Sequence, residues 1–484
     1  NIVSTLYLSK SQDTPELDIQ VLIERVCQKI AVSALQKGYF AAMPIDTVEK
    51  GEFWITNDLL DTSSGRRQYM DWLRTDHPEH PAIIFYDELC YLTLHGYGAF
   101  NSPVWFNVGR DDRDQQVSAC FILGQDDSTE SLLENQQREI KIFRGGSGAG
   151  MSVGRVRGSR EGLSGGGTAS GPVSFMRAYD AWAGTIKSGG KTRRAAKMVS
   201  IDVDHPDVYD FIDSKLREED RLRTLAESGM NIGFDEEGER NVAECTSFQN
   251  ANNSIAVTDE FMSLAISGQN RPNWSLLNRV DGKPSSRVVA SDLFRHIAKA
   301  AWTCADPGLH YIDHMNSMHT TPMIDGEPSP IRSTNPCGEY MSNDDTSCNL
   351  ASLNLLKFLE GANGFNTLKF EQAVDVFITA MDILVSFAYY PDEKIGNNTR
   401  LLRQLGLGYA NMGASIMAQG WAYDSDEGRN FAASVTALMT GRAYRQSAIV
   451  AGALEPFHYF EENRRSMLEV IERHQSHLPP GMSG

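Results

Sequence analysis

Apolar residues recur at helical spacing in the first hundred residues and again near the C-terminal end of the chain. Residues 14–37 repeat them every three or four positions and stop before Gly38, as a capped amphipathic helix does. A similar pattern covers Ile83–His95. Three further segments have the same spacing: 371–389, 428–452 and 463–475. The pattern predicts a mostly helical region over residues 1–100 and a return to helix at the end.

From about Asn101 onward, short β-prone runs alternate with glycine-rich loops and helical patterns. The runs are VSACFILG (117–124), MSVGRVR (151–157), AAKMVSIDV (195–203) and NSIAVT (253–258). Strands that alternate with helices are typical of a parallel sheet with helices packed against it. We therefore expect an α/β fold over residues 101–484.

Composition excludes two classes of partner. The chain of 484 residues has 45 Lys+Arg against 63 Asp+Glu, a formal net charge of −18. This acidic balance lacks the long-range attraction that binders of nucleic-acid polymers and anionic membranes use. The most apolar stretch, 377–390, is interrupted by Asp382 and is shorter than the ~20 residues that span a bilayer. We expect neither a nucleic-acid polymer nor a membrane as partner.

Cysteine usage indicates a reducing compartment. The seven cysteines are Cys27, Cys90, Cys120, Cys245, Cys304, Cys337 and Cys348. Their number is odd, their spacing is irregular, and no two form the CxxC pair that is typical of structural zinc or thioredoxin-like sites. We expect a cytoplasmic protein without a metal site.

Three glycine-rich segments lie close together: 145–150 (GGSGAG), 164–171 (SGGGTASG) and 184–194 (GTIKSGGKTRR). Glycine lets backbone N–H groups approach an anion, although such segments are also ordinary hinges. The third segment is not a P-loop, because Thr185 stands where the first glycine should be. Its basic residues still suit nucleotide phosphates. They are Lys187, Lys191, Arg193 and Arg194.

Two polar clusters resemble metal sites only superficially. The segment 202–211 (DVDHPDVYDF) contains several possible ligands, but we favour a helix start that is capped by Asp204, with Pro206 in the first turn. His310, His314 and His319 lack a carboxylate at helical spacing. We expect these histidines to be structural or exposed.

The segment 333–355 (STNPCGEYMSNDDTSCNLASLNL) holds the strongest chemical signal. Cys337 lies between Asn335 and Glu339, and Cys348 follows eleven residues later. An amide and a carboxylate can hydrogen-bond sugar hydroxyls and move their protons beside a reactive thiol. The alternative is a turn whose cysteine is merely buried.

The surrounding segments favour the chemical interpretation. NPCGE resembles the active-site finger of ribonucleotide reductase catalytic subunits, and further segments agree in order from about residue 82 to 475. These are NSPVWFNVG (101–109), VSACFILG (117–124), FRGGSGAGMSVGRVR (143–157), SGGGTASGPVSFMRAYD (164–180), GTIKSGGKTRRAAKMVSIDVDHPD (184–207) and LGLGYANMGA (405–414). NPCGEYM followed by SCNLASLNLLKF is similar to the class II branch, which depends on adenosylcobalamin. The resemblance implies a ten-stranded α/β barrel, of which about the first half is present, with the finger near 335–348.

The resemblance also implies roles for the residues that match. Cys337 would form the thiyl radical that takes the ribose 3′ hydrogen, Glu339 would act as base at the 3′ hydroxyl, and Asn335 would hold the hydroxyls. Cys120 and Cys348 look like the dithiol pair that delivers two electrons and closes to a disulfide. An external, thioredoxin-like dithiol would then reduce that disulfide.

Other matched positions concern substrate and effector. Ser102, Ala119 and Gly148, together with Asn335 and Glu339, match contacts to the ribonucleotide substrate. Asp127, Ser128 and Arg157 match the site of a deoxynucleotide effector. The basic loop with Lys187, Lys191, Arg193 and Arg194 looks like the loop that communicates between the two sites.

The chain departs from the family by ending before the second half of the barrel. Neither the loop that grips substrate phosphates nor a C-terminal cysteine pair appears before Gly484. Half a barrel would expose strand edges, so we expect a second polypeptide to supply the remaining strands, with a homodimer as a further arrangement. Two alternatives stay open: a class I subunit with an external metalloprotein radical source, and a non-catalytic nucleotide-binding regulatory remnant.

Overall fold

A computed structural model describes residues 18–40, 60–186, 196–230, 246–267, 271–361 and 364–479. The chain forms two compact units. The first combines residues 1–119 with 347–484, and the second comprises residues 120–346. The predicted domain boundary near residue 100 stays a prediction.

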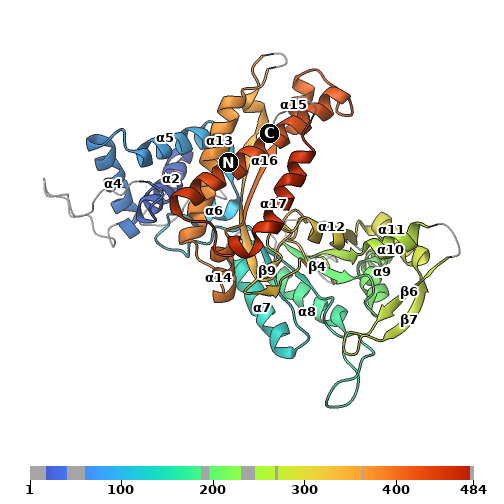
Figure 1. Ribbon diagram of the computed structural model, residues 1–484. Coiled ribbons are helices and arrows are strands. Elements are labelled where there is room, and N and C mark those ends of the chain that lie inside the picture. The colour runs from blue at the N-terminus through green and yellow to red at the C-terminus, as the bar shows by residue number, and fades with distance from the viewer. Residues whose placement is uncertain are drawn as a thin grey trace. The chain divides into compact units, whose positions relative to one another are not determined.

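The second unit is a parallel sheet whose strands are joined by helices (Figure 1). Its strands run in the order β2-β3-β4-β5-β8, and each neighbouring pair is parallel. They are β2 (Cys120–Leu123), β3 (Gly148–Ser152), β4 (Lys197–Asp202), β5 (Asn252–Val257) and β8 (Gly308–Tyr311). The helices are α7 (Thr129–Arg144), α8 (Pro172–Thr185), α9 (Val208–Glu227), α10 (Asp259–Ile266), α11 (Ala290–Cys304) and α12 (Ile312–Ser317). Two small hairpins complete the unit: β6 (Asn273–Leu277) with β7 (Pro284–Val289), and β9 (Met323–Ile324) with β10 (Glu327–Pro328).

The apolar runs form strands because both faces of this sheet are covered. All four residues of β2 are buried, and Val199 and Ile201 of β4 are at most 1% exposed. Strands buried on both faces read as continuous rather than alternating apolar runs. The predicted α/β class is confirmed, as are the strands expected within 117–124, 195–203 and 253–258.

Two predicted boundaries in this unit are wrong. The strand expected at 151–157 is β3, which begins earlier, at Gly148, and ends at Ser152. The helix expected to start after Asp204 is α9, whose N-cap is Asp207. Asp204 instead accepts a hydrogen bond from Arg279 at 2.6 Å, so its carboxylate forms an ion pair and does not cap the helix.

The first unit is mainly helical and has a small sheet. In that sheet β1 (Gly98–Phe100) is antiparallel to β11 (Thr346–Asn354), which is parallel to β12 (Leu405–Ala410). The helices before the sheet's long strand are α2 (Ile19–Gln36), α4 (Ser63–Asp76), α5 (Pro81–Leu94) and α6 (Ser102–Asn107). Those after it are the short η3 (Leu355–Phe358), α13 (Thr367–Phe387), α14 (Glu393–Leu402), α15 (Met412–Ala418), α16 (Asp426–Leu454) and α17 (Phe460–Ser476).

Helix α13 forms the centre of the first unit. Thirteen of its residues are buried, and it packs against α2, α5 and α16. The segments predicted as helices at 83–95, 371–389, 428–452 and 463–475 are α5, α13, α16 and α17, and the helical part of 14–37 that the structure describes is α2. The helical character of the N-terminal region is therefore confirmed.

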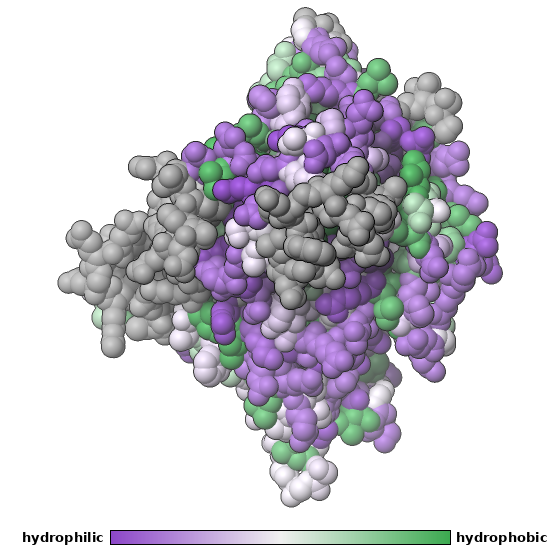
Figure 2. All heavy atoms as spheres, turned by 90° about the vertical axis from the view of Figure 1, so that its left-hand side faces the viewer, coloured by the Kyte–Doolittle hydropathy of each residue, from purple (hydrophilic) through white to green (hydrophobic). Residues whose placement is uncertain are grey.

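The molecular surface carries both hydrophilic and hydrophobic side chains. On the face that Figure 2 shows, hydrophilic side chains predominate among the coloured residues, and hydrophobic ones gather in small separate groups. Among the described residues, no helix combines the length and the apolar character that crossing a membrane requires.

A buried ion pair joins β4 to α7 in the second unit. The Nζ atom of Lys197 lies 2.6 Å from Oε2 of Glu139, and the two side chains are 1% and 0% exposed. The same Nζ lies 4.4 Å from the centre of the Tyr179 ring on α8, a cation–π contact. Burial raises the pKa of Glu139 and lowers the pKa of Lys197, and each charge opposes the change in the other. The start of β4 is thus fixed to two helices.

Replacing one partner of this pair should cost more stability than replacing both. Lys197→Met leaves a buried, uncompensated carboxylate and should destabilise the chain by about 3–5 kcal/mol, whereas Lys197→Met with Glu139→Leu should recover most of the loss. Urea unfolding of the three proteins, followed by fluorescence, measures both effects. A double variant as unstable as the single one would contradict the explanation.

Candidate active site

The segment that carries Cys337, here called the finger (residues 332–340), lies along the strands of the second unit. The Oγ atom of Ser333 is 3.1 Å from the Oγ atom of Ser200 on β4. Further along, the backbone of Thr334 passes Gly150 on β3, and the ring of Pro336 reaches Gly148 at the start of β3. The finger therefore runs from the carboxyl end of the strands toward their amino end.

The glycines of β3 make room for the finger. A Cβ atom at Gly150 would lie 1.8 Å from the carbonyl oxygen of Thr334, and one at Gly148 would lie 2.7 Å from Cγ of Pro336. No side chain fits at either distance, so the strand needs glycine where the finger crosses it. This explains why a GGSGAG segment, which reads as a loop, ends as a strand.

Asn335 folds the tip of the finger. Its Oδ1 atom accepts hydrogen bonds from the backbone N–H groups of Gly338 at 3.1 Å and Tyr340 at 3.0 Å. Gly338 has a positive φ of 87°, which a residue with a side chain rarely adopts. One buried carboxamide thus satisfies the backbone of the turn that contains Cys337.

The other end of the same carboxamide joins two chemical groups. The Nδ2 atom of Asn335 lies 2.7 Å from Oε1 of Glu339 and 2.9 Å from Sγ of Cys120 on β2. Sγ of Cys120 is in turn 3.7 Å from Oε1 of Glu339. Cys337 is exposed. The second unit therefore brings together a thiol, a carboxylate and an amide beside an exposed thiol, which can serve radical or acid–base chemistry on a hydroxylated substrate.

Burial and charge keep Cys120 in its thiol form. Burial is the main cause that raises the pKa of Cys120, and the negative charge of Glu339 raises it further, while the hydrogen bond from Asn335 opposes both. A protonated thiol can donate a hydrogen, whereas a thiolate is the nucleophile.

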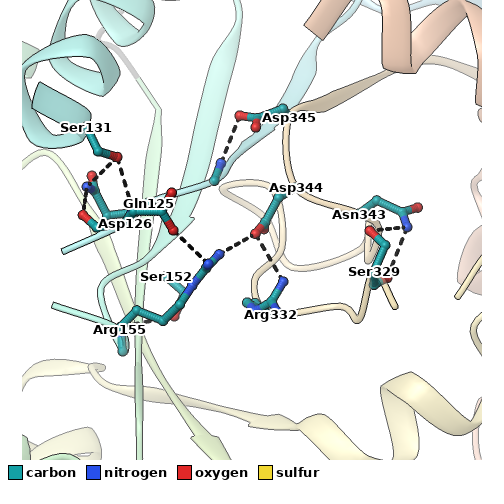
Figure 3. A network of polar contacts seen from close by, with 12 residues as sticks. Gln125, Asp126, Ser131, Ser152, Arg155, Ser329, Arg332, Asn343, Asp344 and Asp345 are labelled. Atoms are coloured by element: carbon teal, nitrogen blue, oxygen red, sulfur yellow. Dashed lines mark hydrogen bonds and ion pairs between the residues drawn. The ribbon is translucent and has the colours of Figure 1, made fainter. Parts of the chain in front are cut away.

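A polar network ties the start of the finger to the residues that follow it (Figure 3). Nη1 of Arg332, at the start of the finger, lies 3.3 Å from Oδ2 of Asp344, which follows the tip. Arg155 bridges the same Asp344 at 2.9 Å and Asp126 at 2.7 Å. Asp345 accepts a hydrogen bond from the backbone N–H of Gly124 at 3.0 Å. The sequence alone did not predict this network. The two consecutive acidic residues Asp344 and Asp345, shortly after the NPCGE motif, were its visible sign.

The three residues expected at an effector site lie close together. Nε of Arg157 donates to Oδ2 of Asp127 at 2.7 Å, and its backbone N–H donates to Oδ1 at 3.1 Å. Ser128 caps α7 by accepting from the N–H of Ser131. Both charged side chains are about a quarter exposed. Of the basic loop, Lys187, Lys191, Arg193 and Arg194 lie outside the described residues.

The remaining predicted site residues belong to the first unit, except Gly148. Ser102 is the first residue of α6, and Ala119 directly precedes β2. Cys348 is buried on β11, where its Sγ donates to the carbonyl oxygen of Asn349 at 3.2 Å. A Cβ at Gly406 on β12 would lie 3.2 Å from that sulfur.

Hydroxyl and amide groups join residues 117–118 to residues 347–350 within the first unit. In the first unit the Oγ atoms of Ser118 and Ser347 lie 2.9 Å apart, and both residues are buried. The side chain of Asn101 donates to the carbonyl of Val117 at 2.8 Å and accepts from the N–H of Leu350 at 2.7 Å. Asn101 and the two serines are further residues that sequence reasoning missed.

The clusters that resembled metal sites have structural partners. Asp207 accepts hydrogen bonds from the backbone and hydroxyl of Ser159, and His205 is buried. Burial lowers the pKa of His310 to about 4, and its Nε2 atom lies 3.5 Å from the hydroxyl of Thr334. Among the described residues, no group of three or more His, Cys, Asp or Glu side chains could hold a metal ion.

Comparisons with known proteins agree on one family. The family model "Ribonucleotide reductase, barrel domain" matches residues 118–477, which confirms the predicted fold class. The chain is 46% identical over 482 residues to the vitamin B12-dependent ribonucleotide reductase of Streptomyces coelicolor and 39% identical over 505 residues to that of Rhodopirellula baltica. These alignments cover 98% of the chain but only 45% and 44% of the relatives. The vitamin B12-dependent ribonucleoside-diphosphate reductase of Mycobacterium tuberculosis is 32% identical over 367 residues, 75% of the chain and 47% of the relative. The chain thus spans less than half the length of these relatives.

The raised pKa of Cys120 predicts slow alkylation in the folded chain. Since the thiolate is the reactive form, Cys120 should react with iodoacetamide much more slowly in the native than in the urea-unfolded chain at every pH from 7 to 9. Glu339→Gln removes a charge that raises this pKa, so it should speed native alkylation of Cys120 at pH 9 several-fold. Peptide mass spectrometry measures the rates.

Glu130→Gln, at an exposed position in the first turn of α7, is the matched control and should leave the rate unchanged. Equal rates for Cys120 in native and unfolded chain would show that neither burial nor Glu339 protects it.

Proposed function

The chain belongs to the ribonucleotide reductase family, and we propose that it supplies the cysteine-radical centre of an enzyme that converts ribonucleotides to 2′-deoxyribonucleotides. The observation that carries this proposal is the cluster of Asn335, Glu339 and Cys120 beside the exposed Cys337. These are the residue types that the reaction needs within reach of one ribose.

Each residue has a defined task in the proposed reaction. A thiyl radical at Cys337 takes the hydrogen atom from C3′ and returns it at the end. Glu339 accepts the proton of the 3′ hydroxyl, and Asn335 donates a hydrogen bond to a ribose hydroxyl in place of its present bond to Glu339. Ser102, Ala119 and Gly148 contact the substrate.

The electrons come from a pair of thiols. Cys120 and Cys348 give up two electrons and two protons and close to a disulfide, while the 2′ hydroxyl leaves as water. The protonated state of Cys120 supports this task, because a thiol can deliver a proton that a thiolate lacks. A thioredoxin-like external dithiol then reduces the disulfide by exchange.

The radical at Cys337 requires an initiator. The relatives are named vitamin B12-dependent. Adenosylcobalamin, when bound, would supply the radical chemistry that converts the Cys337 thiol to a thiyl radical. The exposure of Cys337 fits this group, because an initiator outside the chain needs direct access to the sulfur. A class I arrangement, in which a metalloprotein supplies the radical, is the alternative.

Regulation and assembly complete the proposal. A deoxynucleotide effector binds near Asp127, Ser128 and Arg157, and the basic loop passes its identity to the substrate site. The chain spans 45% of the length of its Streptomyces coelicolor relative. The proposal includes a second polypeptide that supplies the strands and the phosphate-gripping loop of the other barrel half. A homodimer of that assembly is a further proposed arrangement.

Reconstitution tests the function directly. The chain is mixed with a polypeptide that carries the C-terminal half of a relative, adenosylcobalamin, a dithiol, an effector and ribonucleotide, and deoxyribonucleotide is measured. We expect turnover only in the complete mixture. Cys337→Ser should abolish product, and Cys120→Ser or Cys348→Ser should also stop turnover with the dithiol reductant, because a single thiol cannot supply two electrons by closing to a disulfide.

The outcomes separate the alternatives. Normal turnover of Cys337→Ser would remove the radical assignment. Effector binding without turnover in any mixture would favour a regulatory remnant, and turnover that requires a metalloprotein instead of adenosylcobalamin would favour class I.

A further inference from the structure

We propose that Asn252 is a positioning residue for Cys337, which it sets through the carbonyl group of Pro336. This inference rests on the proposed function and adds to it a residue outside the finger. The Nδ2 atom of Asn252 donates a hydrogen bond of 2.7 Å to the carbonyl oxygen of Pro336. That carbonyl belongs to the peptide group whose nitrogen is the backbone nitrogen of Cys337.

The bond controls the orientation of the cysteine because a peptide group is planar. The carbonyl oxygen of Pro336, the N–H of Cys337 and its Cα lie in one plane. Fixing the oxygen therefore fixes the plane from which the Cys337 side chain projects. Proline also has a restricted φ, so little rotation is available on its other side.

The hydrogen bond from Asn252 has a different role from the hydrogen bonds that Asn335 makes within the tip of the finger. The bonds from Oδ1 of Asn335 reach Gly338 and Tyr340, within the same loop, and so determine the shape of the loop. Asn252 lies on β5, so its bond attaches the loop to the sheet. A correctly folded tip that is not attached could still place its thiol wrongly.

Pro336 is held from two sides. Gly148 on β3 leaves only enough space for its ring, since a Cβ there would lie 2.7 Å from Cγ. Asn252 holds its carbonyl oxygen. The residue that precedes Cys337 is thus packed against one strand and hydrogen-bonded to another.

The position of Asn252 is itself fixed. It is the first residue of β5 and pairs with Met198 on β4. Next to it, the N–H of Asn253 donates to Oδ1 of Asp306 at 2.9 Å, and Lys215 bridges the carbonyl of Ala251 and the carboxylate of Asp306. An anchored amide can position a neighbour, whereas a mobile one cannot.

The preceding turn is fixed as well. Asp180 on α8 accepts hydrogen bonds from the backbone N–H groups of Gln249 at 3.3 Å and Asn250 at 2.8 Å. The start of β5 is therefore connected to α8, the helix that precedes the basic loop. A sequence signal existed, since asparagine is depleted in strands and two begin this one.

Two variants remove the hydrogen-bond donor of Asn252, and one of them keeps the shape of the side chain. Asn252→Asp replaces the amide by a carboxylate that cannot donate to Pro336, and Asn252→Ala removes the group entirely. In the reconstituted enzyme, kcat should fall by roughly ten- to a hundredfold while KM for the ribonucleotide stays within about twofold, because misplacement by ~1 Å costs this much in chemistry. Asn252→Gln keeps an amide donor and should recover part of kcat.

A second measurement does not depend on turnover. The rate at which iodoacetamide alkylates Cys337 should rise several-fold in Asn252→Asp and Asn252→Ala, since the exposed tip is no longer attached, while the rate at Cys304 stays constant. Asn273→Asp is the matched control, because Asn273 is also exposed and also begins a strand of this unit. It adds the same charge and should change neither rate.

The outcomes test the role of Asn252 separately from the proposed reductase function. Wild-type kcat and wild-type Cys337 alkylation in both Asn252→Asp and Asn252→Ala would overturn it. A lower thermal midpoint with unchanged kcat and alkylation would make Asn252 merely structural and would also overturn it. If the wild-type mixture shows no turnover, the proposed function fails, and the alkylation rates alone decide the role of Asn252.

Discussion

The hydrogen bonds of one buried carboxamide, that of Asn335, hold the candidate site together. Its oxygen satisfies two N–H groups of the turn, and its nitrogen reaches Glu339 and Cys120. An aspartate would lose the donor and a leucine would lose every bond, and a buried polar group without a partner costs about 1–3 kcal/mol. Loop geometry and chemistry thus depend on the same side chain.

Much of the fold could be predicted from the sequence, because its signals are local. The apolar runs of β2, β4 and β5 and the spacing in α5 and α13 report burial directly. The start of β3 could not be predicted, since glycine disfavours strands and the reason for it is a segment far away in the chain. The prediction that α9 starts after Asp204 was wrong because Asp204 pairs with Arg279, a distant partner that the local sequence pattern cannot reveal.

In the candidate site, too, some residues could be predicted from the sequence and others could not. Asn335, Cys337 and Glu339 could be singled out because their residue types suit the chemistry and because the surrounding segments resemble those of a known family in fixed order. The contact of Asn335 with Cys120 and the network of Arg332, Asp344 and Arg155 could not, since they join segments that only the fold brings together. Asn252 was overlooked because the asparagine pair that begins β5 does not reveal which group its amide bonds.

The two glycines of β3 have a consequence for how such a chain can change. Any larger residue at Gly150 would meet the carbonyl oxygen of Thr334, which is backbone and cannot be trimmed by substitution. No replacement at Thr334 could compensate, so the obstacle cannot be removed by a paired mutation. In a mutational library, position 150 should tolerate nothing but glycine even where the neighbouring buried positions accept several apolar residues. Its restriction would reflect the course of another segment and not any chemistry of its own.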